Sequence, residues 1–404
     1  MLDRRELLRR GMALGLAPAL VPLAGGAVAA PAEPPQVRRR VKLGRTGLEL
    51  PDLGFGSSSL AGDAALVQHA LARGITYFDT AESYQAGSSE ETIGRALAGR
   101  RDAVLLASKQ SAGAHTRRAE LFETLEGSLR RLRTDRIDVY FNHAVNDPAR
   151  LQNDEWYEFA SRAKQAGKLR FTGMSGHGGR LVECLELAVE RKLVDVVLVA
   201  FNFGQDPAFY QKFTGSFDFV ARQPELPRVL AKARAAGIGI VAMKTLRGAR
   251  LNDMRPYEGT GATFAQAAFR WIFSTGLADA LVVTMKSPAQ VDEYLGASGW
   301  TQPHPADAAL LRRYARRTER TQCRYGCSDC ASACPAGVSI PDVLRARMYA
   351  FDYEEPGLAR VALAEAGGAA ACLTCDGTPC ASACPHGVAI PELTKQVSAA
   401  SGTA

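Results

Sequence analysis

Residues 74–110 read GITYFDTAESYQAGSSEETIGRALAGRRDAVLLASKQ and hold one predicted β-strand, one α-helix and a second β-strand. The apolar runs at 75–79 and 103–108 have the length of buried strands, and a segment of helical period at 89–98 lies between them. Strands that alternate with helices are typical of α/β folds with a parallel sheet. This stretch therefore predicts a parallel sheet covered by helices.

The same alternation continues on both sides of this unit. Further strands are predicted near 51–56, 137–141, 169–174, 195–200, 237–243 and 280–284, with helices such as 63–73, 117–133 and 263–274. Eight β-α units in about 260 residues match the size of a (β/α)8 TIM barrel, whose active site lies at the carboxyl ends of the strands. The stretch LGRTGL (43–48) predicts a hairpin that closes the bottom of this barrel.

Length and charge limit the possible functions. The 404 residues predict two or three domains, or one large barrel with an appendage, and 47% apolar with 23% charged residues exclude a disordered chain. The net charge is +7, but residues 1–45 hold nine Lys or Arg against three acidic residues, which leaves +1 for the remainder. Because a nearly neutral body lacks the basic surface that phosphate backbones require, nucleic-acid binding is not expected.

The N-terminus predicts an export signal over residues 1–30, followed by a proline-containing linker at 31–40. The adjacent Arg4 and Arg5 precede a weakly apolar run at 12–23 and then small residues up to Ala30. A membrane anchor is the alternative, but the run is interrupted by Pro18 and Pro22 and falls short of the roughly 20 residues that a bilayer requires. The pattern resembles a twin-arginine signal, which implies a periplasmic protein with no membrane span after cleavage.

Four polar residues follow three neighbouring predicted strands and make up a proton-transfer set. Asp79 ends the strand at 75–79, Tyr84 lies in the next loop, Lys109 ends the strand at 103–108, and His143 follows the strand at 137–141. A tyrosine is a weak acid unless a neighbouring cation stabilises its phenolate. We expect Lys109 to supply that cation, Asp79 to hold Lys109 charged, and His143 to hydrogen-bond a substrate oxygen.

The segments FDTAESY (78–84), LASKQ (106–110) and VYFNHA (139–144), with the start VKLGRTGLELPDLGFGS, resemble the aldo-keto reductases over residues 41 to about 298. The resemblance implies hydride transfer between a nicotinamide cofactor and a small carbonyl or alcohol, with Tyr84 as proton donor. It also implies NADP(H) binding through Ser175, Lys244 and Lys286, which follow the fifth, seventh and eighth strands. Gly176 and Leu198 depart from the family, in which many members have Asn and Gln. His177 could line the substrate pocket or be a solvated loop residue.

The region 301–404 contains an internal duplication rich in cysteine. CASACPAGVSIP (330–341) recurs as CASACPHGVAIP (380–391) with ten of twelve positions identical, and helices are predicted at 341–351 and 391–399. Cys-x-x-Cys turns and a more distant Cys-Pro are typical of ferredoxins that hold [4Fe-4S] clusters. The tail thus resembles a mostly helical two-cluster ferredoxin-like domain, as in an iron-sulfur branch of the reductase family.

In such ferredoxins the fourth cysteine commonly serves the other cluster. The resemblance therefore implies two crossed ligand sets, which are Cys323, Cys327, Cys330 with Cys384, and Cys372, Cys375, Cys380 with Cys334. Tetrahedral zinc and disulfides remain alternatives, although neither requires a Cys-Pro in both copies. Cys184, the ninth cysteine, is expected in the core.

Two functional hypotheses follow from these residues. The first is an exported oxidoreductase whose barrel acts on a carbonyl or alcohol while two clusters exchange electrons with a redox partner protein. The second is an NADPH-dependent carbonyl reductase whose cysteine-rich tail is structural or serves as a docking module.

Overall fold

The structure is a computed structural model of the chain, and it describes residues 34–178, 180–203, 225–246, 254–259, 263–302, 304–318, 321, 323, 327–352 and 356–401. The predicted export signal at 1–30 lies outside the described residues. Among the residues that are described, no helix has the length and apolar composition needed to cross a membrane.

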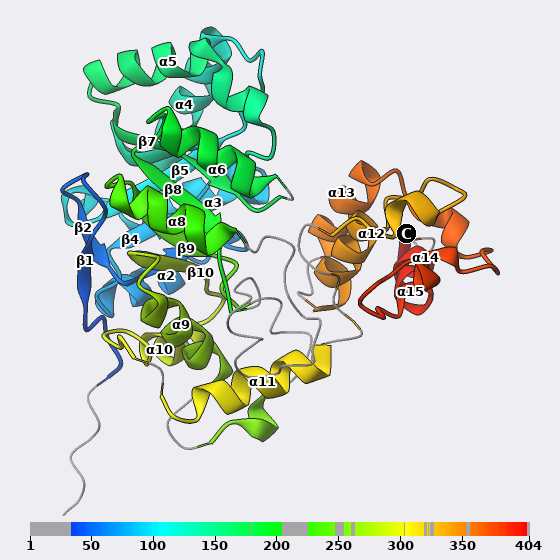
Figure 1. The fold of residues 1–404 in the computed structure, drawn as a ribbon. Helices are drawn as coiled ribbons and strands as arrows, with labels where there is room; N and C mark the ends of the chain where they lie inside the picture. The colour runs from blue at the N-terminus through cyan, green and yellow to red at the C-terminus, as the bar shows by residue number, and fades with distance from the viewer. Residues whose placement is uncertain are drawn as a thin grey trace, which may run out of the picture. The chain divides into compact units, whose positions relative to one another are not determined.

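Eight parallel strands close into a barrel in sequence order, with the last strand paired to the first (Figure 1). The strands are β3 (Leu53–Gly56), β4 (Tyr77–Asp79), β5 (Leu105–Gln110), β6 (Ile137–Asn142), β7 (Leu169–Gly176), β8 (Val196–Ala200), β9 (Gly239–Met243) and β10 (Ala280–Thr284). This confirms the predicted fold class. The predicted strand positions agree with the observed ones to within two residues.

Helices alternate with these strands around the barrel. They are α2 (Ala64–Ala72), α3 (Ser88–Ala96), α4 (Arg118–Leu132), α5 (Asp154–Gln165), α6 (Leu181–Glu190), α8 (Leu226–Ala235), α9 (Phe264–Thr275) and α10 (Pro288–Leu295). Local signals set their ends. In α9 the Thr263 hydroxyl caps the N-terminus by accepting from the amide of Gln266 at 3.2 Å, and Gly276 ends the helix in the left-handed region at φ 66°.

A hairpin of β1 (Arg40–Lys42) and β2 (Glu49–Pro51) precedes the barrel, as the sequence predicts. Its Leu43, Leu48 and Leu50 are buried in one cluster with the residues that fill the barrel interior. Gly44 (φ +49°) is required in this turn, because a Cβ atom there would lie 2.4 Å from the backbone nitrogen of Gly239, where β9 begins. The hairpin therefore closes the end of the barrel opposite to the carboxyl ends of the strands.

All elements described beyond residue 300 are helical. They are α11 (Asp307–Thr318), η6 (Ala331–Ala333), α12 (Ile340–Arg347), the π-helical η7 (Met348–Asp352), α13 (Pro356–Glu365), η8 (Ala370–Cys372), α14 (Pro379–Ser382) and α15 (Ile390–Ser401). The two helices predicted after the cysteine repeats are α12 with η7, and α15. Helix α11 packs on α9 and shares the main core of the barrel through Leu310, Leu311 and Tyr314.

Two smaller apolar clusters hold the cysteine-rich part together. One joins Cys330 and Cys380 to Ile340 and Ile390 from the two repeats. The other places Cys372 beside Val343 of α12 and Val397 of α15. The cysteines thus lie in the interior of this part of the chain, where the repeats meet.

Candidate functional site

Asp79 and Lys109 meet at the carboxyl ends of neighbouring strands. Asp79 pairs in register with Ala107, which brings the next inward-facing residue of β5, Lys109, alongside it. The Lys109 ammonium group donates to Asp79 Oδ1 at 2.6 Å and to the carbonyl oxygen of Thr80 at 2.5 Å. Both side chains are almost fully buried, and the pair is held away from water.

Tyr84 lies over this ion pair in the short helix η1 (Tyr84–Gly87). The Lys109 Nζ atom is 4.7 Å from the centre of the Tyr84 ring. Gln85 and Ala86, which follow, both adopt left-handed φ angles of 52°. Such backbone is unfavourable for residues with a Cβ atom, and it recurs at functional sites. This turn directs the Tyr84 side chain back toward Lys109.

His143 completes the set from the end of β6. Its backbone amide donates to the carbonyl oxygen of Gln110 at 2.8 Å, and its ring packs edge-on against Tyr84 with 5.7 Å between ring centres. Burial and the nearby Lys109 charge lower its pKa from 6.5 to about 3. The imidazole is therefore neutral at neutral pH, so that it can donate a hydrogen bond to a substrate oxygen without carrying charge.

Burial acts on the pKa values of Tyr84 and Lys109 in addition to the neighbouring charges that the sequence suggests. Burial raises the pKa of Tyr84 above 10, and Lys109 opposes this without reversing it. For Lys109, burial lowers the pKa, but the charges of Asp79 and Tyr84 outweigh it and raise the pKa overall. Both directions favour a charged Lys109 beside a protonated Tyr84 at neutral pH. The charge of Lys109 favours the phenolate, while burial has the larger effect on the pKa of Tyr84.

Arg150 is a positioning residue that sequence reasoning missed. It lies in η3 (Pro148–Gln152), and its guanidinium group donates to the carbonyl oxygens of Ala112, His143 and Ala144 and to Asn142 Oδ1, at 2.7 to 2.9 Å. These bonds fix the loop that carries His143. Neither spacing nor residue type distinguishes Arg150 from the many other arginines, so no sequence signal could have identified it.

The three residues predicted to bind the cofactor all lie at the same rim. Ser175, near the end of β7, is buried and accepts from the amide of Ala144 at 2.9 Å. Lys244 follows β9 with a φ of +53° and lies near enough to His143 to help lower its pKa. Lys286 is exposed and precedes α10, whose first turn is capped by Ser287.

The chemistry of this rim fits a phosphate-bearing dinucleotide. Lys286 stands beside a helix N-terminus, where free backbone amides and the helix dipole favour anions. Two polar atoms at the same rim, Asn142 Nδ2 and Thr245 Oγ1, are buried without a hydrogen-bond partner within the described part of the chain. Buried polar groups of this kind are normally satisfied by a ligand, water or ion.

The structure shows the surroundings of Gly176 and Leu198, the two departures from the family pattern, and of His177. A side chain at Gly176 would place its Cβ atom 2.5 Å from Leu181 Cδ1, and so Asn does not fit unless Leu181 moves. Leu198 is buried inside the barrel. His177 is half-buried, and burial together with the Lys244 charge holds its pKa well below 6.5.

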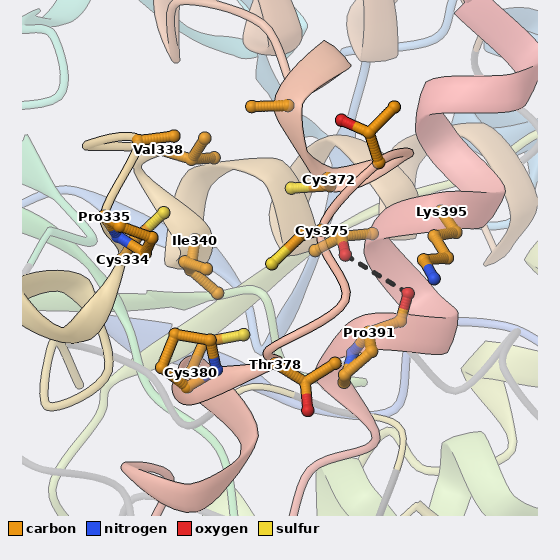
Figure 2. Close-up of a pocket in the computed structure, with 15 residues that line it drawn as sticks. Cys334, Pro335, Val338, Ile340, Cys372, Cys375, Thr378, Cys380, Pro391 and Lys395 are labelled. Carbon is orange, nitrogen blue, oxygen red and sulfur yellow. Dashed lines mark hydrogen bonds between the residues drawn. The ribbon is translucent and has the colours of Figure 1, made fainter.

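The eight clustered cysteines form two groups, each drawn from both repeats. One group surrounds a cavity of about 280 Å³ that Pro335 and Lys395 also line, with sulfur atoms directed inward (Figure 2). Its members are Cys334, Cys372, Cys375 and Cys380. In the other group Cys323 lies close enough to Cys327, Cys330 and Cys384 for their charges to act on its pKa. These are the crossed sets of the sequence analysis, and their binding of iron stays a prediction.

No disulfide joins the nine cysteines, all of which the structure describes, and Cys184 is buried in the barrel core as expected. Burial raises the pKa of Cys323 to about 12 and that of Cys330 to about 11. Within the described ranges, no group of three or more His, Cys, Asp or Glu side chains is placed to hold a single metal ion.

The barrel segment matches a known protein family. The family model of the aldo/keto reductase family matches residues 52–259. The aldo-keto reductase YhdN of Bacillus subtilis is 36% identical over 149 residues, which are 32% of this chain and 44% of that protein. The uncharacterized oxidoreductase YrpG of the same organism is 30% identical over 251 residues, 56% of this chain and 72% of that protein. The chain spans about half the length of the first curated relatives that it matches.

Solved structures show the same barrel. An aldo-keto reductase from Bacillus halodurans in its holo form superposes with a TM-score of 0.54 at 22% identity, over 68% of this chain and 95% of that one. An aldo-keto reductase from Klebsiella pneumoniae in complex with NADPH superposes with a TM-score of 0.52 at 23% identity, over 69% of this chain and 96% of that one. The closed parallel barrel, its rim residues and the extent of the family match lead to one conclusion: the chain belongs to the aldo/keto reductase family.

Proposed function

We propose that this protein is an NADP(H)-dependent oxidoreductase that interconverts a small carbonyl compound and its alcohol. The observation that carries the proposal is the buried Lys109, which contacts both Asp79 and Tyr84 at the carboxyl rim of the barrel. The NADPH complex of the Klebsiella relative and the phosphate-favouring rim at Lys286 support the choice of cofactor. The cofactor, when bound, supplies or accepts the hydride at the carbonyl carbon.

The side chains of the chain provide the remaining chemistry. Because the pKa of Tyr84 is raised, its hydroxyl stays protonated until negative charge develops on the substrate oxygen. Tyr84 then transfers its proton to that oxygen, and the adjacent Lys109 cation stabilises the phenolate that remains. The neutral His143 orients the oxygen by hydrogen bonding. Asp79 keeps Lys109 in place, and water reprotonates Tyr84 after the alcohol leaves.

Replacing Tyr84 by Phe tests this mechanism. With NADPH and a panel of aldehydes and ketones, kcat should fall by about 10² to 10⁴-fold, while the Kd of NADPH stays nearly constant, because only the proton donor is lost. Tyr77→Phe is the matched control, since its buried hydroxyl has no partner among the described residues and does no chemistry. Undiminished turnover in Tyr84→Phe would contradict the proposed role.

We further propose that the cysteine-rich part binds two [4Fe-4S] clusters that exchange electrons with a redox partner. Two sets of four cysteines, each drawn from both repeats, support this proposal, as does the cavity that one of the sets surrounds. Each set would supply four thiolates, and each cluster, when bound, takes up one electron at a time. The residues present therefore fit this group.

Metal analysis tests the cluster proposal. Protein purified without oxygen should contain about eight iron and eight sulfide per chain, as two [4Fe-4S] clusters require. Stoichiometric zinc in their place would refute it. Because such clusters are assembled inside the cell, a twin-arginine signal at residues 1–30 suits a protein exported in folded form. We propose a periplasmic location on this ground, and fractionation of expressing cells tests it.

A further inference from the structure

A row of buried hydroxyl groups lies behind the ion pair of Asp79 and Lys109, between the barrel strands and helix α3. It consists of Ser57, which follows β3, Thr80, which follows β4, and Ser89 in the first turn of α3. All three residues are 0% exposed. The contact between a parallel strand and its helix is normally apolar, because a buried hydroxyl without a partner is destabilising. These three hydroxyls therefore need an explanation in their hydrogen bonds.

The three hydroxyl groups form one chain of hydrogen bonds with a defined direction. The Ser57 hydroxyl donates to the carbonyl oxygen of Asp79 at 2.8 Å. The Ser89 hydroxyl donates to Ser57, whose Oγ at 2.8 Å and carbonyl oxygen at 3.0 Å are its acceptors. Because the single proton of Ser89 is used in this way, the Thr80 hydroxyl, 3.0 Å away, must donate to Ser89 Oγ. The chain thus begins at Thr80 and ends at Asp79, its neighbour in the sequence.

Both ends of this chain lie on the residues that hold Lys109. The Lys109 ammonium group donates to Asp79 Oδ1 and to the Thr80 carbonyl oxygen. The hydroxyl chain binds the same two residues through other atoms, which are the Asp79 carbonyl oxygen and the Thr80 side chain. Hydrogen bonds in such a chain polarise and strengthen one another where the surroundings are of low polarity. Removing the Ser89 hydroxyl would therefore interrupt the chain between its two ends.

We propose that Ser89 is a positioning residue, whose hydroxyl holds the segment 79–80 so that two oxygen atoms of this segment keep Lys109 charged and close to Tyr84. The inference rests on the proposed function, in which the Lys109 cation stabilises the Tyr84 phenolate. An ammonium group that loses an acceptor gives up its proton more readily. A cation that moves away from Tyr84 also stabilises the phenolate less, because the attraction between charges weakens with distance.

Two variants interrupt the hydroxyl chain at different points. Ser89→Ala removes its middle link, and Thr80→Val removes its first hydroxyl while nearly keeping the shape of the side chain. In both variants, kcat for NADPH-driven carbonyl reduction should fall by about 10 to 10²-fold, while the Kd of NADPH stays nearly constant. Thr80→Ser keeps the hydroxyl and should retain most of the wild-type kcat. If one of the two variants does not fold, the other carries the test.

The protonation of Lys109 can also be measured without turnover. Competitive acetylation with acetic anhydride between pH 8 and 11, followed by peptide mass spectrometry, reports the neutral amine of Lys109 in protein without substrate. In both variants this lysine should become reactive at a lower pH than in wild type. The titratable groups that act on it or respond to it are kept in both variants, and they are Asp79, Tyr84 and His143. A loss of stability alone would not produce this shift.

Ser298→Ala is the matched control, because Ser298 is also 0% exposed and its hydroxyl donates to Asp52 at 2.7 Å, at the opposite end of the barrel. This variant should lower the free energy of unfolding without changing kcat or the reactivity of Lys109. An unchanged kcat or an unchanged reactivity of Lys109 in folded Ser89→Ala or Thr80→Val would overturn the inference, as would equal changes in Ser298→Ala. Failure of the proposed function is a different result, in which wild type itself reduces no carbonyl with NADPH and the inference falls with it.

Discussion

At the scale of single residues, Lys109 organises the proposed active site because its ammonium group binds two oxygen atoms and faces the Tyr84 ring. It donates to Asp79 and to the Thr80 carbonyl oxygen, and it lies 4.7 Å from the centre of the Tyr84 ring. A buried cation would normally lose its proton, but the paired carboxylate prevents this. The same low-polarity surroundings keep His143 neutral, and this has a consequence for stability.

The pKa of His143 predicts a loss of stability in acid. Below pH 6.5 the unfolded chain protonates this histidine, whereas the folded protein does not until about pH 3. The folded-state pKa is depressed, so the free energy of unfolding falls as the pH drops from about 6.5 toward 3. His177 acts in the same direction. Each such group contributes about 1.4 kcal/mol per pH unit to the dependence of the free energy of unfolding on pH.

Urea unfolding of wild type and His143→Gln at pH 7, 6, 5 and 4 measures this effect. Between pH 6 and 4, the free energy of unfolding of the variant should depend less steeply on pH, by the contribution of about one proton. The contribution of His177 to this dependence should remain. Comparing the two proteins cancels the contribution of the carboxylates. Identical slopes would show that His143 titrates alike in the folded and unfolded protein.

At the scale of elements, a buried ion pair joins α11 to the barrel. Arg270 in α9 donates two parallel hydrogen bonds to Asp307, the first residue of α11, at 2.7 and 2.8 Å. Both side chains are at most 2% exposed, and the indole ring of Trp300 lies 5.2 Å from the guanidinium carbon. Such a pair fixes orientation more than it adds stability, because both charges must leave water.

Removing one partner of this pair should therefore lower the free energy of unfolding more than removing both partners. We expect Arg270→Met to lower the free energy of unfolding by about 3 to 5 kcal/mol, since it leaves Asp307 charged and buried. The double variant Arg270→Met with Asp307→Leu should recover much of this loss. Arg228→Met is the control, because the ion pairs of Arg228 are exposed and worth at most about 1 kcal/mol. A double variant no more stable than Arg270→Met would contradict this view.

At the scale of the whole molecule, the two sites use separate sets of residues. Asp79, Tyr84, Lys109 and His143 belong to strands and loops of the barrel, while the cysteine groups belong to the repeats beyond residue 320. In the proposed function, hydride transfer from added NADPH requires no residue of the cysteine groups. Electrons from a one-electron donor, in the proposed function, enter through the clusters.

Replacing Cys330 and Cys380 by Ser removes one ligand from each cysteine group and separates these two activities. In folded protein, the iron content and turnover with an artificial one-electron donor should be lost, whereas NADPH-driven carbonyl reduction should persist. Cys184→Ser is the control and should keep all its iron, since Cys184 lies in the barrel core. If both activities persist in cluster-free protein, the cysteine-rich part is structural or serves docking.

The sequence by itself determined the barrel and the location of its rim residues. Strand period and length are local properties, and parallel strands that close in order must place all their carboxyl ends at one rim, which explains why Asp79, Lys109 and His143 could be predicted together. The fifty-residue repeat likewise indicated two related cysteine groups.

Only the tertiary structure decided how these groups behave. Burial at the rim sums contributions from many distant residues, and so no motif reveals that Tyr84 is held protonated or that His143 is neutral. Arg150 acts through the carbonyl oxygens of a folded loop, which have no sequence signature.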